Sequence, residues 1–207
     1  MLQALSPSEY GSSLASLIDT ELQLRRDRLS EALGEVEAYA ASWGPGRLVV
    51  VLDTNVLLAA GPRVARIDWD SVLNSTFSSA VFTIPIQVVE ELDRLKDRGS
   101  AEVRSNARFV LKWLDELDLH GDHSKLFGTT AHNTAIRVWV DDNDRVPLAE
   151  VDRDIIDRTQ QLMPYAKRIV IVSMDRSMIL RARTYGLETA LLSDEDIPPR
   201  EATTNAN

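Results

Sequence analysis

The residues most suited to catalysis are four carboxylates placed near the ends of apolar runs: Asp53, Glu91, Asp152 and Asp175. Asp53 directly follows the apolar run 47–52, and Asp175 comes two residues after the run 168–173 ends at Ser173. Short runs rich in β-branched residues are typical of strands buried on both faces of a parallel sheet. Ligands bind beyond the carboxyl ends of such strands. We therefore expect these two acids to meet at one edge of a sheet.

The other two acids belong to segments with helical periodicity. Glu91 lies in the first turns of a helix that follows the apolar run 81–84. Asp152 opens a later helix and, at spacings of three and four, shares its inward side with Ile155 and Ile156. Four acids from four separate segments can therefore converge on one crevice.

Each acid alone also has a purely structural interpretation. Asp53 or Asp152 could serve only as the N-cap of a helix. Glu90 or Glu91 could be present because acids in a first turn favour the helix dipole. The joint placement of the acids next to apolar segments favours a shared site over four separate structural roles.

A cluster of carboxylates predicts a particular chemistry. Unpaired carboxylates repel one another and are costly to bury. A hard divalent cation removes this cost, and an all-oxygen ligand set indicates Mg²⁺ or Mn²⁺ rather than zinc. Such a centre suits phosphodiester hydrolysis, in which the cation activates water and neutralises charge that develops on the phosphate.

The segments around these acids alternate between strand and helix. The predicted strands are 47–52, 81–84, 136–140, 168–173 and 187–192, with 136–140 at an edge. The predicted helices are 86–98, 101–117, 151–163 and 175–185, and Gly186 caps the last. A loop is predicted at 120–133 and a turn at 141–144. This order indicates an α/β domain with a mainly parallel sheet.

A helical arm is predicted ahead of this domain, over residues 13–39. Its apolar residues recur at spacings of three, four and seven: Leu14, Ile18, Leu22, Leu29, Leu33, Val36 and Ala40. Residues 44–46, Gly-Pro-Gly, end the arm. The arm either packs on its own domain or serves as a dimerisation or partner-binding arm.

Composition limits the class of protein. The 207 residues include no cysteine, which excludes disulfides and thiolate zinc sites and fits a reducing cytoplasm. The first residues lack the features of a secretory signal, and no run is long enough for a membrane span. We therefore expect a cytoplasmic protein. The net charge of −9 argues against a nucleic-acid binder, although local fields and a bound cation can override it.

Taken together, four segments make the sequence similar to the PIN domain family. They are VVVLDTN (49–55), IPIQVVEELDRLK (84–96), DRDIID (152–157) and IVIVSMDRSMILRARTYGL (169–187), in the family's order. The resemblance implies a Rossmann-like three-layer domain with a Mg²⁺- or Mn²⁺-dependent nuclease site, usually acting on single-stranded RNA. Its products would carry 5′-phosphate and 3′-hydroxyl ends.

The resemblance also implies roles for individual residues. Asp53 matches the first metal ligand, Glu91 matches the second acid better than Glu90, and Asp175 matches the last. Asp152 fits the spacing of the third acid, with Asp154 and Asp157 as alternatives. Asn55 and Ser173 match positions that support the site by hydrogen bonding.

The sequence departs from the family pattern in two places. The N-terminal arm is not part of the minimal domain, and the segment 120–147 is longer than in the small toxin members of the family. These departures favour a larger PIN type, resembling those of RNA-processing proteins, over a toxin.

Basic residues follow two of the acids, Glu91 and Asp175, or lie on the helix after Glu91, and they are candidate contacts for substrate phosphates. They are Arg94, Lys96, Arg98, Arg104, Arg108, Lys112, Arg176, Arg181 and Arg183. We favour Lys96 and Arg176, while an ordinary solvated helix face accounts for most of the others. Three histidines in the predicted loop region, His120, His123 and His132, lack the spacing of a zinc site. The four tryptophans are expected to pack in the core or at a domain edge rather than stack on bases.

The sequence thus predicts three regions: a helical extension (1–46), a PIN-like domain (47–192) and an acidic flexible tail (193–207). The leading hypothesis is a metal-dependent endoribonuclease for single-stranded RNA. The alternatives are a catalytically weak PIN-fold scaffold that binds RNA or protein, and a structure-specific DNA nuclease with the same site. A homodimer or a protein partner would use the N-terminal helix.

Overall fold

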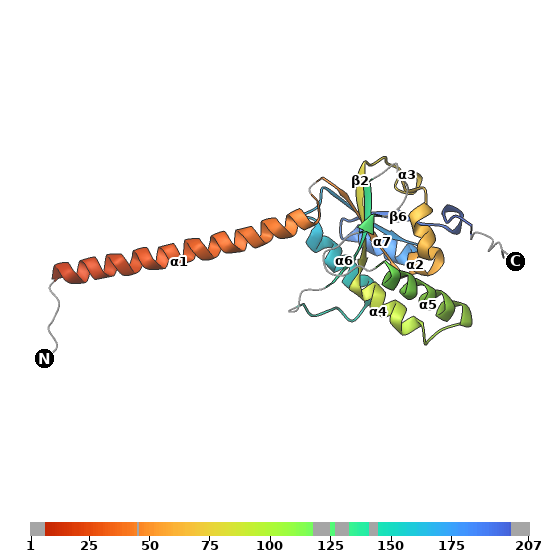
Figure 1. The fold of residues 1–207 in the computed structure, drawn as a ribbon, viewed down its shortest axis with the longest axis horizontal. Helices are drawn as coiled ribbons and strands as arrows, with labels where there is room; N and C mark the ends of the chain where they lie inside the picture. The colour runs from red at the N-terminus through yellow and green to blue at the C-terminus, as the bar shows by residue number, and fades with distance from the viewer. Residues whose placement is uncertain (1–6, 45, 118–124, 127–132, 141–144, 200–207) are drawn as a thin grey trace. The chain divides into compact units, whose positions relative to one another are not determined.

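The computed structural model describes residues 7–44, 46–117, 125–126, 133–140 and 145–199 (Figure 1). The chain divides into two compact units, residues 1–42 and residues 43–207. The first contains the long helix α1 (Pro7–Ser42), which covers and extends the arm predicted at 13–39. The second unit contains the α/β domain.

One six-stranded sheet forms the centre of the second unit, in the order β3-β4-β2-β1-β5-β6. Its strands are β1 (Leu48–Leu52), β2 (Ser79–Pro85), β3 (Lys125–Leu126), β4 (Asn133–Trp139), β5 (Arg168–Ser173) and β6 (Glu188–Leu191). Neighbouring strands are parallel except for the short β3, which pairs antiparallel with β4. The predicted edge strand therefore begins earlier, at Asn133, and β3 lies outside it. The mainly parallel sheet is confirmed.

The strand order contains a reversal of direction beside β1. From β1 the chain steps to β2 and β4 on one side, and it then crosses to β5 and β6 on the other. Because such crossovers are right-handed, helices that connect strands in opposite directions cover opposite faces of the sheet. The three-layer α/β architecture predicted from the sequence is confirmed. The reversal also creates the switch point at which open α/β sheets bind ligands.

The helices of this unit are mostly those predicted, with shifts of a few residues at their ends. They are α2 (Thr54–Ala60), α3 (Trp69–Val72), α4 (Ile86–Leu95), α5 (Ala101–Glu116), α6 (Val151–Leu162) and α7 (Arg176–Thr184). Two 3₁₀ helices, η1 (Gly61–Arg66) and η2 (Asp194–Asp196), complete the order. Gly186 follows α7 with a φ of 77°, a conformation that favours glycine.

Three short elements between β1 and β2 were not predicted. The segments α2, η1 and α3 are each too short to repeat a helical period clearly. Caps define two of them instead: the Asp53 side chain caps α2, and the Asp68 side chain caps α3.

The hydrophobic core lies around the two central strands. Every residue of β1 is buried, and so are five of the six residues of β5. Trp69 packs against Phe82 with ring centroids 4.8 Å apart, which joins α3 to β2. These strands are rigidly held, so the residues that follow them have fixed positions.

Two further predictions concern the ends of the domain. The segment predicted as a flexible tail contains η2 in its described part, and the Arg63 guanidinium donates to the Pro198 carbonyl at 2.8 Å. Residues 200–207, and the turn predicted at 141–144, lie outside the described residues. In the described part of the chain, no helix combines the length and the apolar character needed to cross a membrane.

Candidate active site

Asp53 lies at the junction of β1 and α2, beside the end of β5. Its backbone N–H donates to the Val172 carbonyl at 3.1 Å, which extends the pairing of β1 with β5 by one residue. Its side chain is only 4% exposed. One carboxylate oxygen accepts from the Thr54 N–H at 2.7 Å, and the other accepts from the Ser173 hydroxyl at 2.6 Å.

Burial changes the acidity of this carboxylate. The removal of water raises the pKa of Asp53 from its ordinary 3.8 to about 6, although the hydrogen bonds from Ser173 and Thr54 oppose the change. The negative charges of Asp152 and Glu91 raise the pKa further. Asp53 is therefore a buried acid with acidic neighbours from two other helices.

Glu91 reaches the site from α4. Its carboxylate accepts a hydrogen bond of 2.5 Å from the hydroxyl of Thr54, the residue next to Asp53. The neighbouring Glu90 is exposed, whereas Glu91 is partly buried. Thr54 was not among the predicted site residues, although its place after a strand-end aspartate was a usable signal.

Asp152 approaches from the first turn of α6 and is half-buried. Burial is the main cause of its raised pKa, and the negative charges of Asp175 and Glu91 add to the effect. The Arg181 guanidinium, 3.5 Å from the carboxylate, opposes it. Asp152 thus interacts electrostatically with each of the other three acids of the site, Asp53, Glu91 and Asp175.

The two alternatives to Asp152 have other partners. Asp154 is fully buried and accepts two hydrogen bonds from Arg145, at 2.7 and 3.1 Å, and one from the Leu148 N–H at 2.7 Å. Asp157 accepts from Arg145 at 3.2 Å and from Gln161 at 3.0 Å. Because Arg145 pairs with both, the geometry favours Asp152 as the acid that faces the site.

Asp175 is the N-cap of α7. Its carboxylate accepts from the Ser177 N–H at 2.7 Å and from the Ser177 hydroxyl at 3.0 Å, and these bonds lower its pKa. Its own N–H donates to the Ser173 hydroxyl oxygen at 2.9 Å. Ser173 therefore connects Asp53 to Asp175, at the carboxyl end of β5.

The donor set of this site fits a hard divalent cation, since it consists of carboxylate oxygens around a buried acid. Within the described residues, however, no three acidic or histidine side chains are already gathered at the spacing of metal ligands. The Asp175 carboxylate accepts from Ser177, and an Arg181 nitrogen lies 3.5 Å from the Asp152 carboxylate.

Comparison with known proteins places this arrangement in a family. A family model described as a PIN domain matches residues 50–192, which is more than half of the chain. The chain belongs to the PIN domain family. The resemblance seen in the sequence is thereby confirmed, and the PIN fold is of a nuclease type.

The other comparisons add little about function. No curated protein matches the chain. A solved structure, described as a domain of a functionally unknown protein from Methanocaldococcus jannaschii DSM 2661, is similar to it with 16% identity and a TM-score of 0.44. The match covers 77% of this chain and 99% of the other. A similarity of this size supports no argument about function.

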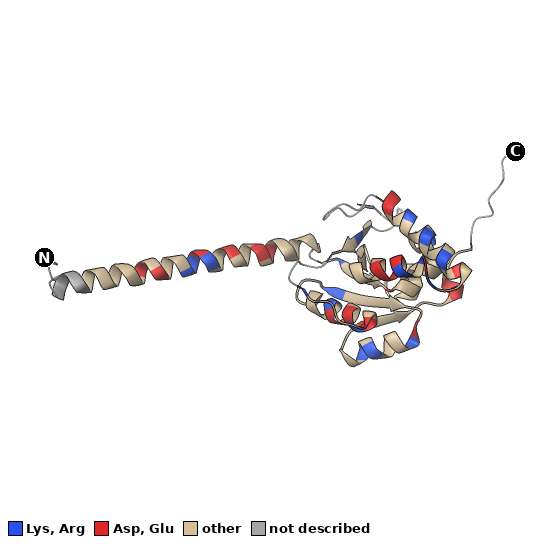
Figure 2. Cartoon of the chain, turned by 90° about the horizontal axis from the view of Figure 1, so that it is seen from below, with Lys and Arg blue, Asp and Glu red and all other residues tan. Residues whose placement is uncertain are grey.

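The remaining predicted site residues of the PIN domain lie outside the acidic cluster. Asn55 is exposed in the first turn of α2, and among the described contacts none joins its side chain to an acid. Lys96 pairs with Asp93 at 2.5 Å, and Arg176 is exposed at the start of α7, next to Asp175. Figure 2 shows both basic and acidic residues on the helices of the domain. The three histidines lie outside the described residues.

A buried arginine fixes the two helices that carry Glu91 and Asp152. The Arg158 guanidinium, from α6, donates to the Gln87 side chain of α4 at 3.4 Å and to the Trp139 carbonyl at 3.2 Å. It also lies 3.8 Å from the centre of the Trp139 ring. This contact was not predicted, because an arginine on a helix is usually exposed.

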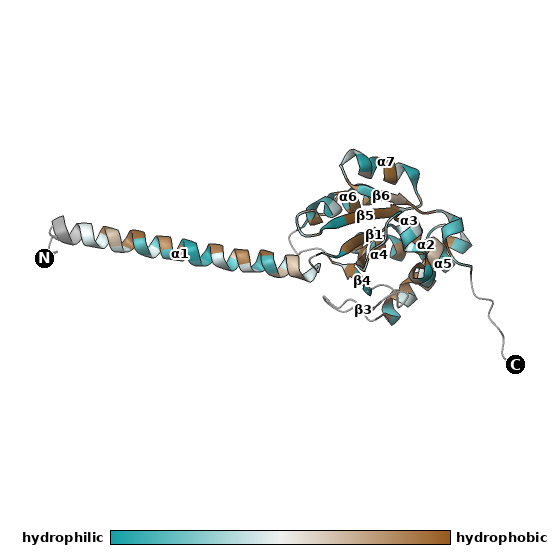
Figure 3. Cartoon of the chain, turned by 90° about the horizontal axis from the view of Figure 1, so that it is seen from above, coloured by the Kyte–Doolittle hydropathy of each residue, from teal (hydrophilic) through white to brown (hydrophobic). Residues whose placement is uncertain are grey.

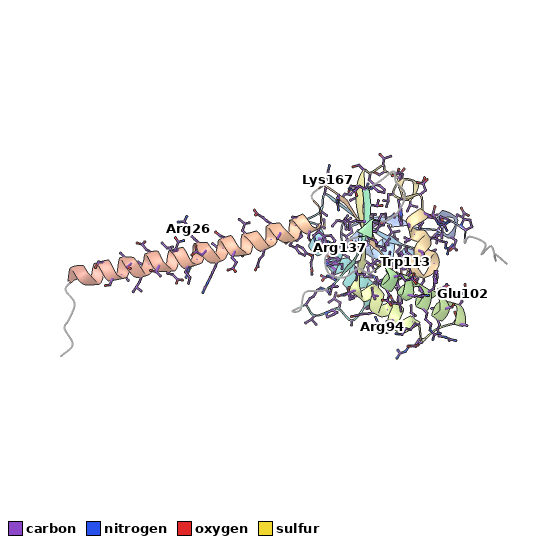
Figure 4. All side chains as sticks on the ribbon, in the orientation of Figure 1. Arg26, Arg94, Glu102, Trp113, Arg137 and Lys167 are labelled. Atoms are coloured by element: carbon purple, nitrogen blue, oxygen red, sulfur yellow. The ribbon has the colours of Figure 1, made fainter. Side chains whose placement is uncertain are left out.

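The same stack continues to the start of the domain. Trp139 meets Trp43 edge to face at 5.2 Å, and the Arg137 guanidinium lies 4.0 Å from the Trp43 ring centre. Figure 4 shows Arg137 inside the domain, whereas Arg94 projects outward from α4. Trp43 and Trp139 are therefore core residues, as expected from the sequence.

A hollow of the described domain lies away from the acids. It has a volume of about 670 Å³ and is lined by residues of α2, η1 and α5, among them Arg63, Arg66 and Phe109. None of the four acids lines it. We therefore base the proposed function on the chemistry of the acidic site and not on this hollow.

Proposed function

We propose that this PIN domain is a metal-dependent endoribonuclease that hydrolyses phosphodiester bonds of single-stranded RNA. The observation that carries the proposal is the buried Asp53, whose pKa is raised to about 6 and whose neighbours Asp152 and Glu91 are also acids. An arrangement of this kind is unfavourable for folding alone, and it is typical of a functional site. The nuclease-type fold of the family supports the same conclusion.

In this proposal Asp53, Glu91, Asp152 and Asp175 hold one or two Mg²⁺ or Mn²⁺ ions. When bound, the metal would activate water and stabilise the charge that develops on the phosphate. Ser173 orients Asp53 by donating to it, and Thr54 orients Glu91 in the same way. Lys96 and Arg176 are the proposed contacts for the RNA backbone.

The preference for RNA rests on the family resemblance, and the lack of cysteine fits the cytoplasm as the place of action. A structure-specific DNA nuclease would use the same carboxylates. A scaffold would not need a buried acid with acidic neighbours, so the arrangement around Asp53 favours catalysis over the scaffold.

The decisive experiment compares two adjacent glutamates of α4. Three full-length proteins are compared: the wild type and the variants Glu91→Gln and Glu90→Gln. Each is incubated with labelled single-stranded RNA and with DNA of the same sequence, in Mg²⁺, Mn²⁺ or EDTA. We expect metal-dependent cleavage of RNA by the wild type and by Glu90→Gln, because Glu90 is exposed. Glu91→Gln should lose at least about a hundredfold in rate, since a metal ligand supplies several kcal/mol.

Each other outcome corrects the proposal in a definite way. Faster cleavage of DNA than of RNA would replace the substrate while keeping the site. Equal activity of Glu91→Gln and the full chain would remove Glu91 from the site. If folded protein with metal cut neither polymer, the scaffold alternative would replace the nuclease.

A further inference from the structure

Helix α1 presents a stripe of large apolar side chains to solvent. Its members are Leu14, Ile18, Leu22, Leu29, Leu33 and Val36, each between 48% and 71% exposed. At 3.6 residues per turn, these positions fall within about 100° of one another around the helix. We call these six residues the α1 stripe. Figure 3 shows the corresponding hydrophobic segments recurring along α1.

An exposed stripe of this length calls for a partner. Helical segments gain most of their stability from packing an apolar face, rather than from propensity alone. Contiguous apolar surface on a soluble protein usually marks an interaction site. The 36 residues of α1 would extend about 54 Å at 1.5 Å per residue, so the stripe suits another long helix.

The charges of α1 narrow the choice of partner. Between residues 13 and 42 the sequence contains six acids, against three arginines. A negatively charged helix is repelled by nucleic acid and by anionic membranes, which both select basic faces. Figure 2 shows the basic residues of α1 in the middle part of the helix, with acidic residues on both sides of them along the chain. The partner is therefore another protein helix.

The spacing of the stripe matches a heptad repeat. Leu22, Leu29 and Val36 are seven residues apart and take the a positions, while Ile18 and Ala32 take d positions. Leu14 and Leu33 flank this seam. Arg25, at the d position between them, is 70% exposed and pairs with Glu21 of its own helix at 2.8 Å. Its long side chain can leave the seam while its charge stays in water.

Charge complementarity selects a second copy of this chain. In a parallel, in-register pair, a g position of one helix faces the e position of the next heptad on the other. This rule places Glu21 opposite Arg26 on both sides of the pair. The remaining g–e combinations are Leu14–Asp19, Arg28–Leu33 and Glu35–Ala40, and none brings like charges together. Figure 4 shows the Arg26 side chain projecting from α1.

We propose that two copies of this chain associate through α1 as a parallel, two-stranded coiled coil along the α1 stripe. The proposal does not depend on nuclease activity, because it rests on α1 alone. Each dimer would carry two PIN domains.

The first test is the mass of the full-length protein in solution, measured by sedimentation equilibrium at micromolar concentration. We expect twice the 23.1 kDa of one chain. The variant Leu22→Glu/Leu29→Glu should weaken the dimer by at least about a hundredfold, because it buries charge in place of two leucines. A monomeric wild-type chain, or a stable trimer or tetramer, would overturn the proposal.

The helix offers a matched control for that variant. Leu17 and Leu24 are also exposed, at 67% and 44%, and they are seven residues apart, but they lie outside the stripe. Leu17→Glu/Leu24→Glu should remain a dimer. Dissociation of this control would show that the stripe is not the interface. Thermal unfolding of each variant checks that the PIN domain stays folded.

A charge exchange tests orientation and register. Glu21→Arg places arginines opposite each other in the parallel pair, and Arg26→Glu places glutamates there. Each variant alone should dimerise about tenfold more weakly, because two favourable pairs become unfavourable. Mixed together, the two variants should form a heterodimer as stable as the wild type. A mixture no tighter than either variant alone would overturn the parallel, in-register arrangement.

Discussion

Two aspartates on α6, only two residues apart, have opposite surroundings. Asp154 is buried against Arg145, which donates two hydrogen bonds to it, and the Leu148 N–H donates a third. Asp152 is half-buried near Glu91 and Asp175, and the nearest cationic nitrogen, on Arg181, is 3.5 Å away. Burial and acidic neighbours raise the pKa of Asp152.

The difference distinguishes acids whose charge stabilises the fold from acids whose charge destabilises it. Asp154 has a partner for each oxygen, so its burial strengthens the packing of α6 on the loop before it. Burial and acidic neighbours disfavour the charged forms of Asp53 and Asp152, and folding gains nothing from bringing these acids together. Removing an acid of the first kind should destabilise the fold, whereas removing an acid of the second kind should lower activity without destabilising the fold.

The largest effect is expected from Asp154→Ala. The substitution leaves Arg145 without its main partner in a site where the arginine is 14% exposed. We expect a loss of about 3–5 kcal/mol in the free energy of unfolding, measured with urea. Asp157→Ala is the matched control, because its carboxylate is 45% exposed and should contribute at most about 1 kcal/mol. Equal losses in the two variants would contradict the comparison.

The pH dependence of stability should show that the charged form of Asp53 is disfavoured in the folded state. Its pKa rises from 3.8 to about 6 on folding, so the folded state holds its proton more tightly than the unfolded state does. Stability from this group is therefore present below pH 4 and is lost as pH rises to about 6. The loss is about 3 kcal/mol, since a pKa change of one is worth about 1.36 kcal/mol.

The measurement compares Asp53→Asn with the wild type in EDTA, by urea unfolding between pH 4 and pH 7. Asparagine is also a good N-cap, so α2 should persist. The stability of the variant relative to the wild type should rise by about 2.4 kcal/mol across this range. A pH-independent difference would show that Asp53 titrates normally.

Asp152→Asn should affect activity without affecting stability. We expect a loss of about a hundredfold in metal-dependent cleavage, with the free energy of unfolding unchanged within about 1 kcal/mol. Initial rates at saturating Mn²⁺ and urea unfolding of the same preparation provide the two measurements. Full activity would exclude Asp152 from the site and reopen the choice between Asp154 and Asp157.

The smallest of these effects is expected from Ser173→Ala. The hydroxyl donates to Asp53 and accepts from the Asp175 N–H, so its removal loosens both acids. We expect Mn²⁺ affinity, measured by calorimetric titration, to fall about tenfold to a hundredfold. Ser177→Ala should have a smaller effect, because its hydroxyl contacts only Asp175. A larger effect of Ser177→Ala would show that α7 controls the site.

The sequence was sufficient for the central strands and for the placement of Asp53 and Asp175 near strand ends. The strand β5 has the predicted bounds because an unbroken apolar run is required where both faces are covered. The run ends where the chain leaves the sheet, so the next polar residues lie at its edge. The strand β4 was harder, because its alternating pattern includes the buried Arg137 and begins beside a polar segment.

The contacts that distinguish one acid from another could not be predicted from the sequence. Whether Asp152 or Asp154 faces the site depends on Arg145, which precedes α6 in the chain and donates a hydrogen bond to the Asp154 carboxylate on that helix. The position of α6 against α4 depends on Arg158 and Gln87, which are separated by 71 residues. Helical spacing gives the direction of a side chain around its own axis, but it does not give the partner that the direction meets.

The hydrogen bonds around Asp53 have a direction that cannot be reversed. A backbone N–H can only donate, so the bond from Asp175 to Ser173 occupies an acceptor site on the serine oxygen. The single hydroxyl proton is thereby directed to Asp53, whose other oxygen receives the Thr54 N–H. Each carboxylate oxygen has about two lone-pair sites, and one on each oxygen is used in this way. Hydrogen bonds within the protein thus occupy about half of the lone-pair sites of Asp53, and the other half remain available to an electrophile.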